Sequence, residues 1–294
     1  MRKLQLTFLS ALLIGGMAAC TNESVDASSK LYDDNDAQIK TYATAKNLNG
    51  TTRPSGLYYV ITTANPTGKQ PAVGEEVEFS FKSYNLQDQL VDSTKANLPV
   101  YYPLGIKSIL AGLEEGISLM REGEKATLLI PSYLGYNDQA VNASLPAYSV
   151  VRFDVQLKRS RTEDQQIDEY IAAQKLAVTE KTTSGLRFIK TADNPAGAAP
   201  TIGQTLTIRY KGKQLRSASA FDSTGTGTFD AVLGQNRFIK GFEEGLAKMK
   251  VGEKATIIFP SSIGYDKQGS VQNNRYVITP YAPLRFDLEV VSAK

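Results

Sequence analysis

The stretch Phe238-Ile239-Lys240-Gly241-Phe242-Glu243-Glu244-Gly245 decides how the chain is organised, because part of it occurs twice. The pattern Gly-x-Glu-Glu-Gly at 241–245 is also present at 112–116, and Gly-Glu-Lys-Ala-Thr at 252–256 is present at 123–127, after the same interval. A repeat this long is typical of duplicated domains, because the units of solenoid proteins have only about 20 to 50 residues. The sequence therefore predicts two related domains, at 35–160 and 161–294.

Within each copy the apolar residues follow the periods of strands and of one helix. They alternate with polar residues in Val151–Leu157 and Leu284–Val290, as expected for strands with one buried face. From Phe238 to Met249 they have the spacing of a helix face instead. We expect an α+β fold in which each domain is a twisted antiparallel β-sheet wrapped around one short α-helix. An additional helix is predicted ahead of each domain, at 36–48 and at 162–176.

The N-terminus has the pattern of an export signal. Arg2 and Lys3 precede an apolar run, Leu4–Met17, that is too short to span a bilayer. Residues 1–19 are therefore predicted to be a signal peptide, and the polar residues 20–34 a tether.

Met17-Ala18-Ala19-Cys20 resembles the lipobox of bacterial lipoproteins, in which the cysteine is acylated. The alternative is ordinary signal cleavage beside an unmodified cysteine. Cys20 is the only cysteine, and an unpaired thiol has no evident use in a secreted protein. The resemblance implies a lipid anchor on Cys20 and a place in the cell envelope. It implies the outer membrane, because residue 21 is threonine and not the aspartate associated with inner-membrane retention in some bacteria.

Composition excludes several kinds of chemistry. The 294 residues include no histidine and one cysteine, so His/Cys zinc sites, Ser-His-Asp triads and Cys-His dyads are impossible. The formal net charge of +3 and the lack of a basic stripe argue against nucleic-acid binding.

The second copy resembles the FKBP family of peptidyl-prolyl isomerases over 185–291. Six short motifs occur in the family's order: Tyr210-Lys211-Gly212, Phe221-Asp222-Ser223, Leu233-Gly234, Phe238–Gly245, Gly252-Glu253 and Gly264-Tyr265. The resemblance implies isomerisation of X-Pro bonds in unfolded or flexible polypeptides outside the cytoplasm, without a cofactor or metal. Macrolides are a further ligand class that it implies.

The resemblance also implies a proline pocket whose floor is Phe242, where the family usually has tryptophan. The Ile239 N–H and the Tyr265 hydroxyl would donate hydrogen bonds to substrate carbonyls, and Asp222 would face the twisted amide. The other implied pocket residues are Tyr210, Phe221, Phe229, Phe238, Phe286 and, at the border, Ile278. Ordinary core packing is the alternative for such an aromatic set. The loop after Asp222, at 223–228, contains no arginine that could pair with it as in better-known family members, which leaves its orientation open.

The first copy keeps the scaffold but loses aromatic residues at the corresponding positions. Phe81, Val91, Val100 and Leu113 stand where the second copy has Tyr210, Phe221, Phe229 and Phe242. The residues retained there are Asp92, Leu110, Tyr136 and Phe153. We expect weak or absent isomerase activity in the first copy. The rival hypothesis for the whole chain is a non-catalytic chaperone or partner-binding lipoprotein that uses these clefts.

Overall fold

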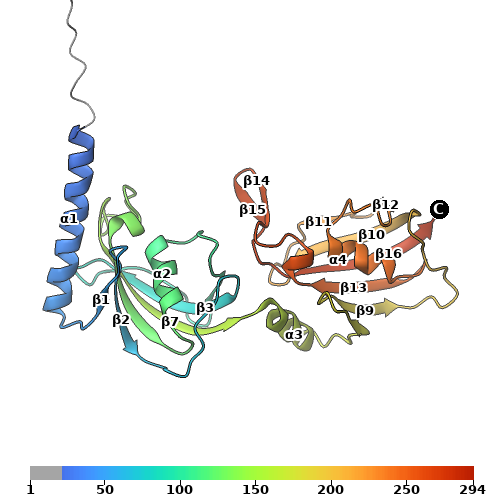
Figure 1. The fold of residues 1–294 in the computed structure, drawn as a ribbon, viewed down its shortest axis with the longest axis horizontal. Helices are drawn as coiled ribbons and strands as arrows, with labels where there is room; N and C mark the ends of the chain where they lie inside the picture. The colour runs from blue at the N-terminus through green and yellow to red at the C-terminus, as the bar shows by residue number, and fades with distance from the viewer. Residues whose placement is uncertain (1–21) are drawn as a thin grey trace, which may run out of the picture.

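The computed structural model describes residues 22–294, with side chains from residue 30 onward. The predicted signal peptide and Cys20 lie outside the described residues. The chain forms two domains, each built on a seven-stranded antiparallel sheet, as predicted (Figure 1). The first sheet has the order β1-β2-β6-β7-β3-β4, with β5 paired to β3. Its strands are β1 (Thr51–Thr52), β2 (Tyr58–Thr63), β3 (Glu76–Tyr84), β4 (Leu90–Ser93), β5 (Val100–Pro103), β6 (Lys125–Ile130) and β7 (Val151–Arg161).

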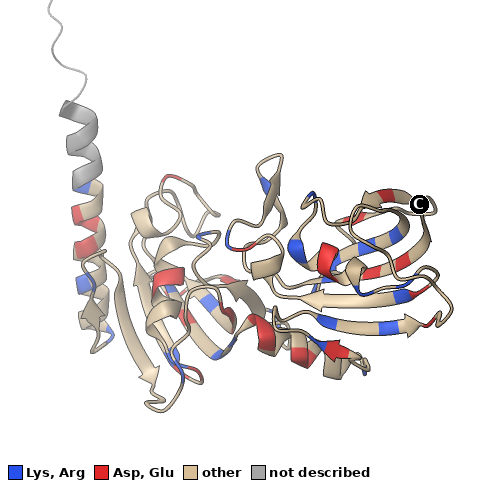
Figure 2. Cartoon of the chain, turned by 45° about the vertical axis from the view of Figure 1, so that its right-hand side comes forward, with Lys and Arg blue, Asp and Glu red and all other residues tan. Residues whose placement is uncertain are grey.

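The second sheet repeats this arrangement, in the order β11-β10-β16-β13-β9-β8, with β12 paired to β10. Its strands are β8 (Glu180–Lys181), β9 (Arg187–Ala192), β10 (Thr205–Gln214), β11 (Asp222–Ser223), β12 (Phe229–Val232), β13 (Lys254–Phe259) and β16 (Leu284–Ala293). A separate hairpin, β14 (Ser270–Gln272) and β15 (Arg275–Ile278), projects from this domain (Figure 1). Lys and Arg are interspersed with Asp and Glu over both domains (Figure 2).

One short helix packs against each sheet, as predicted: α2 (Ala111–Leu119) and α4 (Lys240–Ala247). The glycines of the repeated Gly-x-Glu-Glu-Gly pattern make this contact close. A Cβ at Gly241 or Gly245 would lie 2.6 Å from side-chain atoms of Phe259 or Ile257 on β13. Short 3-10 turns, η1 (Ser132–Leu134) and η2 (Ser261–Ile263), follow β6 and β13.

The two additional helices also form, and one is longer than predicted. Helix α1 (Asn22–Ala45) begins well before position 36, so most of the segment predicted to be a tether is helical. Residues 22–45 contain neither glycine nor proline, so nothing interrupts the helix there. Ile39 and Tyr42 pack beside Leu129 of the first domain. No helix among residues 22–294 is long and apolar enough to cross a membrane.

Helix α3 (Glu163–Ala173) joins the domains and belongs to the second. Thr162, the first residue of the predicted helix, is its N-cap, in a capping box with Gln165. Ile167 is fully buried against Ile189 and Ile258 of the second sheet. Because β7 ends at Arg161 and the N-cap is the next residue, no linker separates the first sheet from α3.

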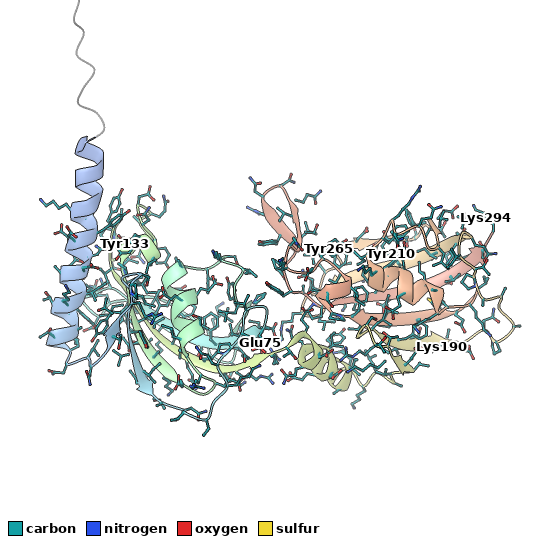
Figure 3. All side chains as sticks on the ribbon, viewed as in Figure 1. Glu75, Tyr133, Lys190, Tyr210, Tyr265 and Lys294 are labelled. Atoms are coloured by element: carbon teal, nitrogen blue, oxygen red, sulfur yellow. The ribbon has the colours of Figure 1, made fainter. Side chains whose placement is uncertain are left out.

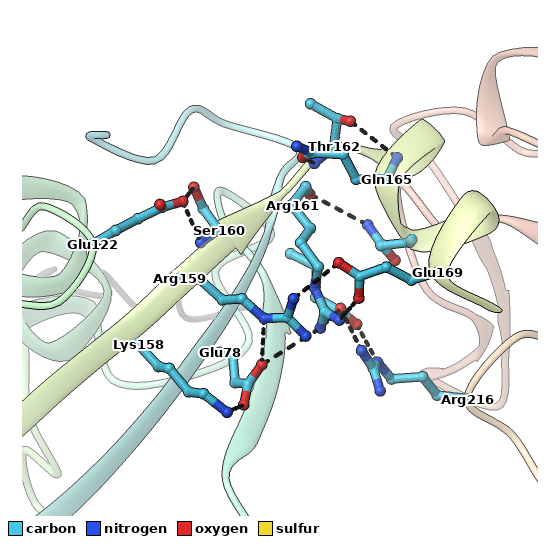
Figure 4. A network of polar contacts seen from close by, with 12 residues as sticks. Glu78, Glu122, Lys158, Arg159, Ser160, Arg161, Thr162, Gln165, Glu169 and Arg216 are labelled. Atoms are coloured by element: carbon cyan, nitrogen blue, oxygen red, sulfur yellow. Dashed lines mark hydrogen bonds and ion pairs between the residues drawn. The ribbon is translucent and has the colours of Figure 1, made fainter. Parts of the chain in front are cut away.

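Charged side chains hold the two domains together at this junction (Figure 4). Arg216 of the second domain donates to both carboxylate oxygens of Glu76 on β3, at 2.6 and 2.9 Å. Arg161 donates to the same carboxylate. The Arg216 guanidinium also lies 3.6 Å from the ring centroid of Tyr101. The Glu76 side chain is only 10% exposed, and these two arginines supply the ion pairs that offset the cost of burying it.

Candidate active site

The second domain contains a cavity of about 360 Å³ beside α4, and most of the predicted pocket residues line it. Sheet strands supply one wall, and the start of α4 with the residues preceding it supplies the other. The lining residues are Tyr210, Phe221, Asp222, Phe229, Arg237, Phe238, Ile239, Phe242, Tyr265 and Phe286. Figure 3 locates Tyr210 and Tyr265, the latter near the base of the β14–β15 hairpin. The predicted set is thus brought together at one cavity, except for Ile278.

Edge-to-face aromatic packing forms the base of the cavity. The Phe242 ring lies 5.5 Å from that of Tyr210 and 5.1 Å from that of Phe286, both nearly perpendicular to it. Phe229 and Phe238 form a similar pair at 5.8 Å on the other side. Phe242 and Phe286 are each only 4% exposed. The base is therefore rigid, apolar and continuous with the domain core.

Gly212 on β10 allows two of these rings to meet. A Cβ at this position would lie 2.5 Å from the Phe286 ring and 2.8 Å from the Phe221 ring. The two rings pack edge to face at 5.6 Å. Since real side chains do not tolerate contacts this short, the aromatic wall requires glycine at 212.

Asp222 is held by a tyrosine rather than by an arginine. The Tyr210 hydroxyl donates to the Asp222 carboxylate at 2.7 Å, across the pairing of β10 with β11. Burial, followed by this hydrogen bond, raises the pKa of Tyr210 to about 12. The hydroxyl therefore remains protonated at neutral pH and can donate to the carboxylate. The orientation of Asp222, which the sequence left open, is thus set by Tyr210.

Two hydrogen-bond donors at the cavity have no partner among the residues that the structure describes. Ile239 is the N-cap of α4, and its N–H makes no hydrogen bond to another group within residues 22–294. The Tyr265 hydroxyl likewise has none among the described side chains, and burial followed by the charge of Asp222 raises its pKa. A ligand with two carbonyl groups could accept from both.

Two residues differ from the prediction. Ile278 is 2% exposed and packs in the core, and it is not among the lining residues. Arg237 lines the cavity but was not predicted. The sequence feature that could have indicated Arg237 is its position directly before Phe238, because the chain neighbour of a pocket residue lies close to the pocket.

Comparison with known proteins agrees with this geometry. FKBP-type peptidyl-prolyl cis-trans isomerases, as a family, match residues 67–158 and 197–291, which together exceed half of the chain. The chain therefore belongs to the FKBP-type isomerase family. Both of its domains are FKBP domains.

Individual relatives match parts of the chain. The human peptidyl-prolyl cis-trans isomerase FKBP9 is 27% identical over 222 residues, which cover 74% of this chain and 35% of that protein. The probable FKBP-type isomerase FkpA of Neisseria meningitidis is 36% identical over 107 residues, covering 36% of this chain and 38% of that one. The chain thus spans about a third of the length of the human relative.

A shorter relative and a solved structure complete the comparison. The FK506-binding protein 1B of Neurospora crassa is 40% identical over 99 residues, covering 31% of this chain and 84% of that one. The crystal structure of the three FKBP domains of wheat FKBP73 aligns with 83% of this chain and 99% of that one, at 18% identity and a TM-score of 0.39.

The first FKBP domain lacks the features that form the cavity in the second. Phe81 has no hydroxyl to donate to Asp92, whose carboxylate accepts instead from the N–H of Ser93. Ser83 stands where the second domain has Gly212, and its buried side chain donates to the Asp92 carbonyl. Val91 stands where the second domain has Phe221, whose ring would lie 2.8 Å from a Cβ at position 212.

Several predicted residues of the first domain nevertheless gather at the equivalent place. Phe81 and Phe153 pack at 5.3 Å, above the buried Leu113. Leu110 is the N-cap of α2, and burial raises the pKa of Tyr136. The first domain therefore keeps an apolar site with a tyrosine but not its aromatic wall.

Proposed function

We propose that the second FKBP domain catalyses cis–trans isomerisation of X-Pro bonds in polypeptides outside the cytoplasm. The observation that carries this proposal is the aromatic cavity with two unpartnered donors, the Ile239 N–H and the Tyr265 hydroxyl. Proline fills the apolar base, and the donors hold the carbonyl groups on either side of it.

Such a site speeds isomerisation without a catalytic base. Rotation about the peptide bond breaks amide resonance against a barrier of about 18 to 20 kcal/mol. The twisted amide is less dipolar than either planar isomer. It therefore loses less hydration free energy than they do on transfer from water to the apolar cavity. Interactions that are stronger with the twisted amide than with the planar ones lower the barrier. Asp222, fixed by Tyr210, lies where it can act on the rotating amide.

The test compares matched substitutions in the two domains of the otherwise intact chain. Phe242→Ala and Tyr265→Phe should lower kcat/KM for a Leu-Pro peptide, by roughly ten-fold or more for Phe242→Ala because the cavity floor is lost. Leu113→Ala and Tyr136→Phe, the corresponding changes in the first domain, should have little effect. NMR exchange spectroscopy measures the rate directly. No acceleration by the folded parent protein would contradict the enzyme proposal.

The first domain supports a second proposal, that it binds polypeptide segments without catalysis. The observations behind it are the missing hydroxyl at Phe81 and the serine and valine at positions 83 and 91. Titration with a proline peptide should shift NMR signals of Phe153 and Tyr136 even in a Phe242→Ala variant. Absence of any shift would contradict it.

Export and lipid anchoring are proposed from residues 1–21 of the sequence. The apolar run and the Ala-Ala-Cys pattern support export and acylation of Cys20, and the proposed address at the outer membrane rests on Thr21. Labelling with radioactive palmitate in a bacterial host should depend on Cys20 and be lost in Cys20→Ser. Labelling that persists in this variant would contradict the anchor.

A further inference from the structure

Arg237 is the one cation among the residues that line the second cavity. Its side chain is exposed, and its guanidinium makes no ion pair or hydrogen bond with any side chain from residue 30 onward. The backbone at this point is fixed, because the N–H of Arg237 donates to the Glu243 side chain at 3.1 Å. The backbone of Arg237 is therefore fixed beside the cavity, while its guanidinium has no partner in the part of the chain whose side chains are described.

The acidic groups near the rim are already used. Asp222 is the one carboxylate among the lining residues, and it accepts from the Tyr210 hydroxyl at 2.7 Å. Glu243 accepts from the backbone of the loop that carries Arg237. Lys240, at the start of α4, is a further exposed cation close in the chain. The positive charge at this side of the cavity is thus available to a bound polypeptide.

The first domain differs at this position. The repeat aligns Arg237 with Ser108, which is neutral and whose N–H donates to the Tyr102 hydroxyl at 3.0 Å. The first domain therefore has no cation at this position, and the nearest one in its loop is Lys107, one residue earlier in the chain. Because Arg237 lines this cavity, its charge can act on a polypeptide bound there and so affect which sequences bind.

We infer that Arg237 makes the second domain prefer X-Pro segments with an aspartate or glutamate beside the proline. The guanidinium binds a carboxylate through two parallel hydrogen bonds, with more directional preference than a lysine. The inference rests on the proposed isomerase function and adds a substrate class to it. Because Arg237 is exposed, the preference is modest, roughly two- to five-fold, and weakens with salt.

The test uses peptides that differ in charge alone, with the whole protein. Pairs with Glu or Gln before proline, and pairs with Glu or Gln after it, are compared by NMR exchange at low ionic strength. The expected ratio of kcat/KM for Glu over Gln is roughly two to five in one of the two pairs. Arg237→Gln should bring this ratio to about one, and Arg237→Glu should invert it.

A control substitution and a salt series complete the design. Lys254→Gln removes a cation from β13 that does not line the cavity, and it should leave the ratio unchanged. Half-molar sodium chloride should reduce the ratio of the parent protein towards one. Isomerisation with no preference for Glu in either pair, or a preference that Arg237→Glu leaves intact, would overturn the assignment. A protein that accelerates no peptide at all would instead overturn the proposed isomerase function.

Discussion

At position 212 the second domain has glycine where the first has Ser83, and the neighbouring wall residue changes with it, from Val91 to Phe221. The serine side chain and the phenylalanine ring would occupy the same space, because a Cβ at 212 already lies 2.8 Å from the ring. Glycine at position 212 is therefore a condition for the Phe221 part of the aromatic wall, which the first domain lacks.

Gly212→Ser should therefore displace the Phe221 and Phe286 rings and lower kcat/KM of the intact protein by about ten-fold or more, since small displacements at a catalytic cavity are costly. The matched change Ser83→Gly in the first domain should leave the rate unchanged. Peptide isomerisation and NMR signals of the aromatic rings measure the two effects. A Gly212→Ser protein with full activity would show that the wall is not needed.

At the scale of elements, much of the fold was predictable because periodicity in the sequence reports local structure. The sheets, α2 and α4 followed from apolar spacing, and Thr162 marked the start of α3. The β14–β15 hairpin was not predicted, although Asn273 and Asn274 have positive φ angles of 50° and 58°, as a tight hairpin turn requires. The two adjacent asparagines were the sequence feature that could have predicted this hairpin turn.

The Tyr210–Asp222 hydrogen bond and the Glu76–Arg216 contact were not predictable in the same way. Each depends on which strands or domains come together, and the spacing of residues in one sequence does not report that pairing. The cavity residues themselves were predicted because the family resemblance supplies their arrangement. Arg237 was missed because its side chain is not part of that shared pattern.

Helix α1 offers a pH test at the same scale. Asp88, in the turn between β3 and β4, accepts from Tyr42 of α1 and from Lys46, which directly follows that helix, each at 2.6 Å. The hydrogen bond from Lys46, followed by that from Tyr42, lowers the pKa of Asp88 to about 2. A carboxyl whose pKa is lower in the docked state stabilises docking above its ordinary pKa of about 4, and this stabilisation disappears as the pH falls through 2.

Amide exchange of residues 36–45, corrected for its intrinsic pH dependence, should therefore accelerate between about pH 4 and pH 2. In Asp88→Asn the exchange should be faster at neutral pH, and it should depend less on pH in this range. Identical pH profiles for the parent protein and the variant would show that Asp88 does not hold α1.

For the whole molecule, the contact of Glu76 on the first sheet with Arg216 of the second domain predicts that the domains move as one body. Arg216→Gln removes the bond from the second domain and should cost roughly 1 kcal/mol of docking energy, because Arg216 is 45% exposed while Glu76 is 10% exposed. NMR relaxation should give one rotational correlation time for both domains of the parent protein and two different times for the variant. Arg209→Gln, which removes an arginine of β10 that pairs with Glu289 inside the second domain, is the control. Equal times in Arg216→Gln would contradict this role.

The direct passage from β7 into α3 has a consequence for clients that are longer than one binding site. With no slack between the domains, a polypeptide held by the first domain has its next proline within a fixed reach of the second. The effective concentration of that proline at the second domain depends on how far apart the prolines of the client lie, because the distance between the two domains is fixed. Spacing along the client would then act as a filter, favouring chains whose prolines recur at the distance between the two domains.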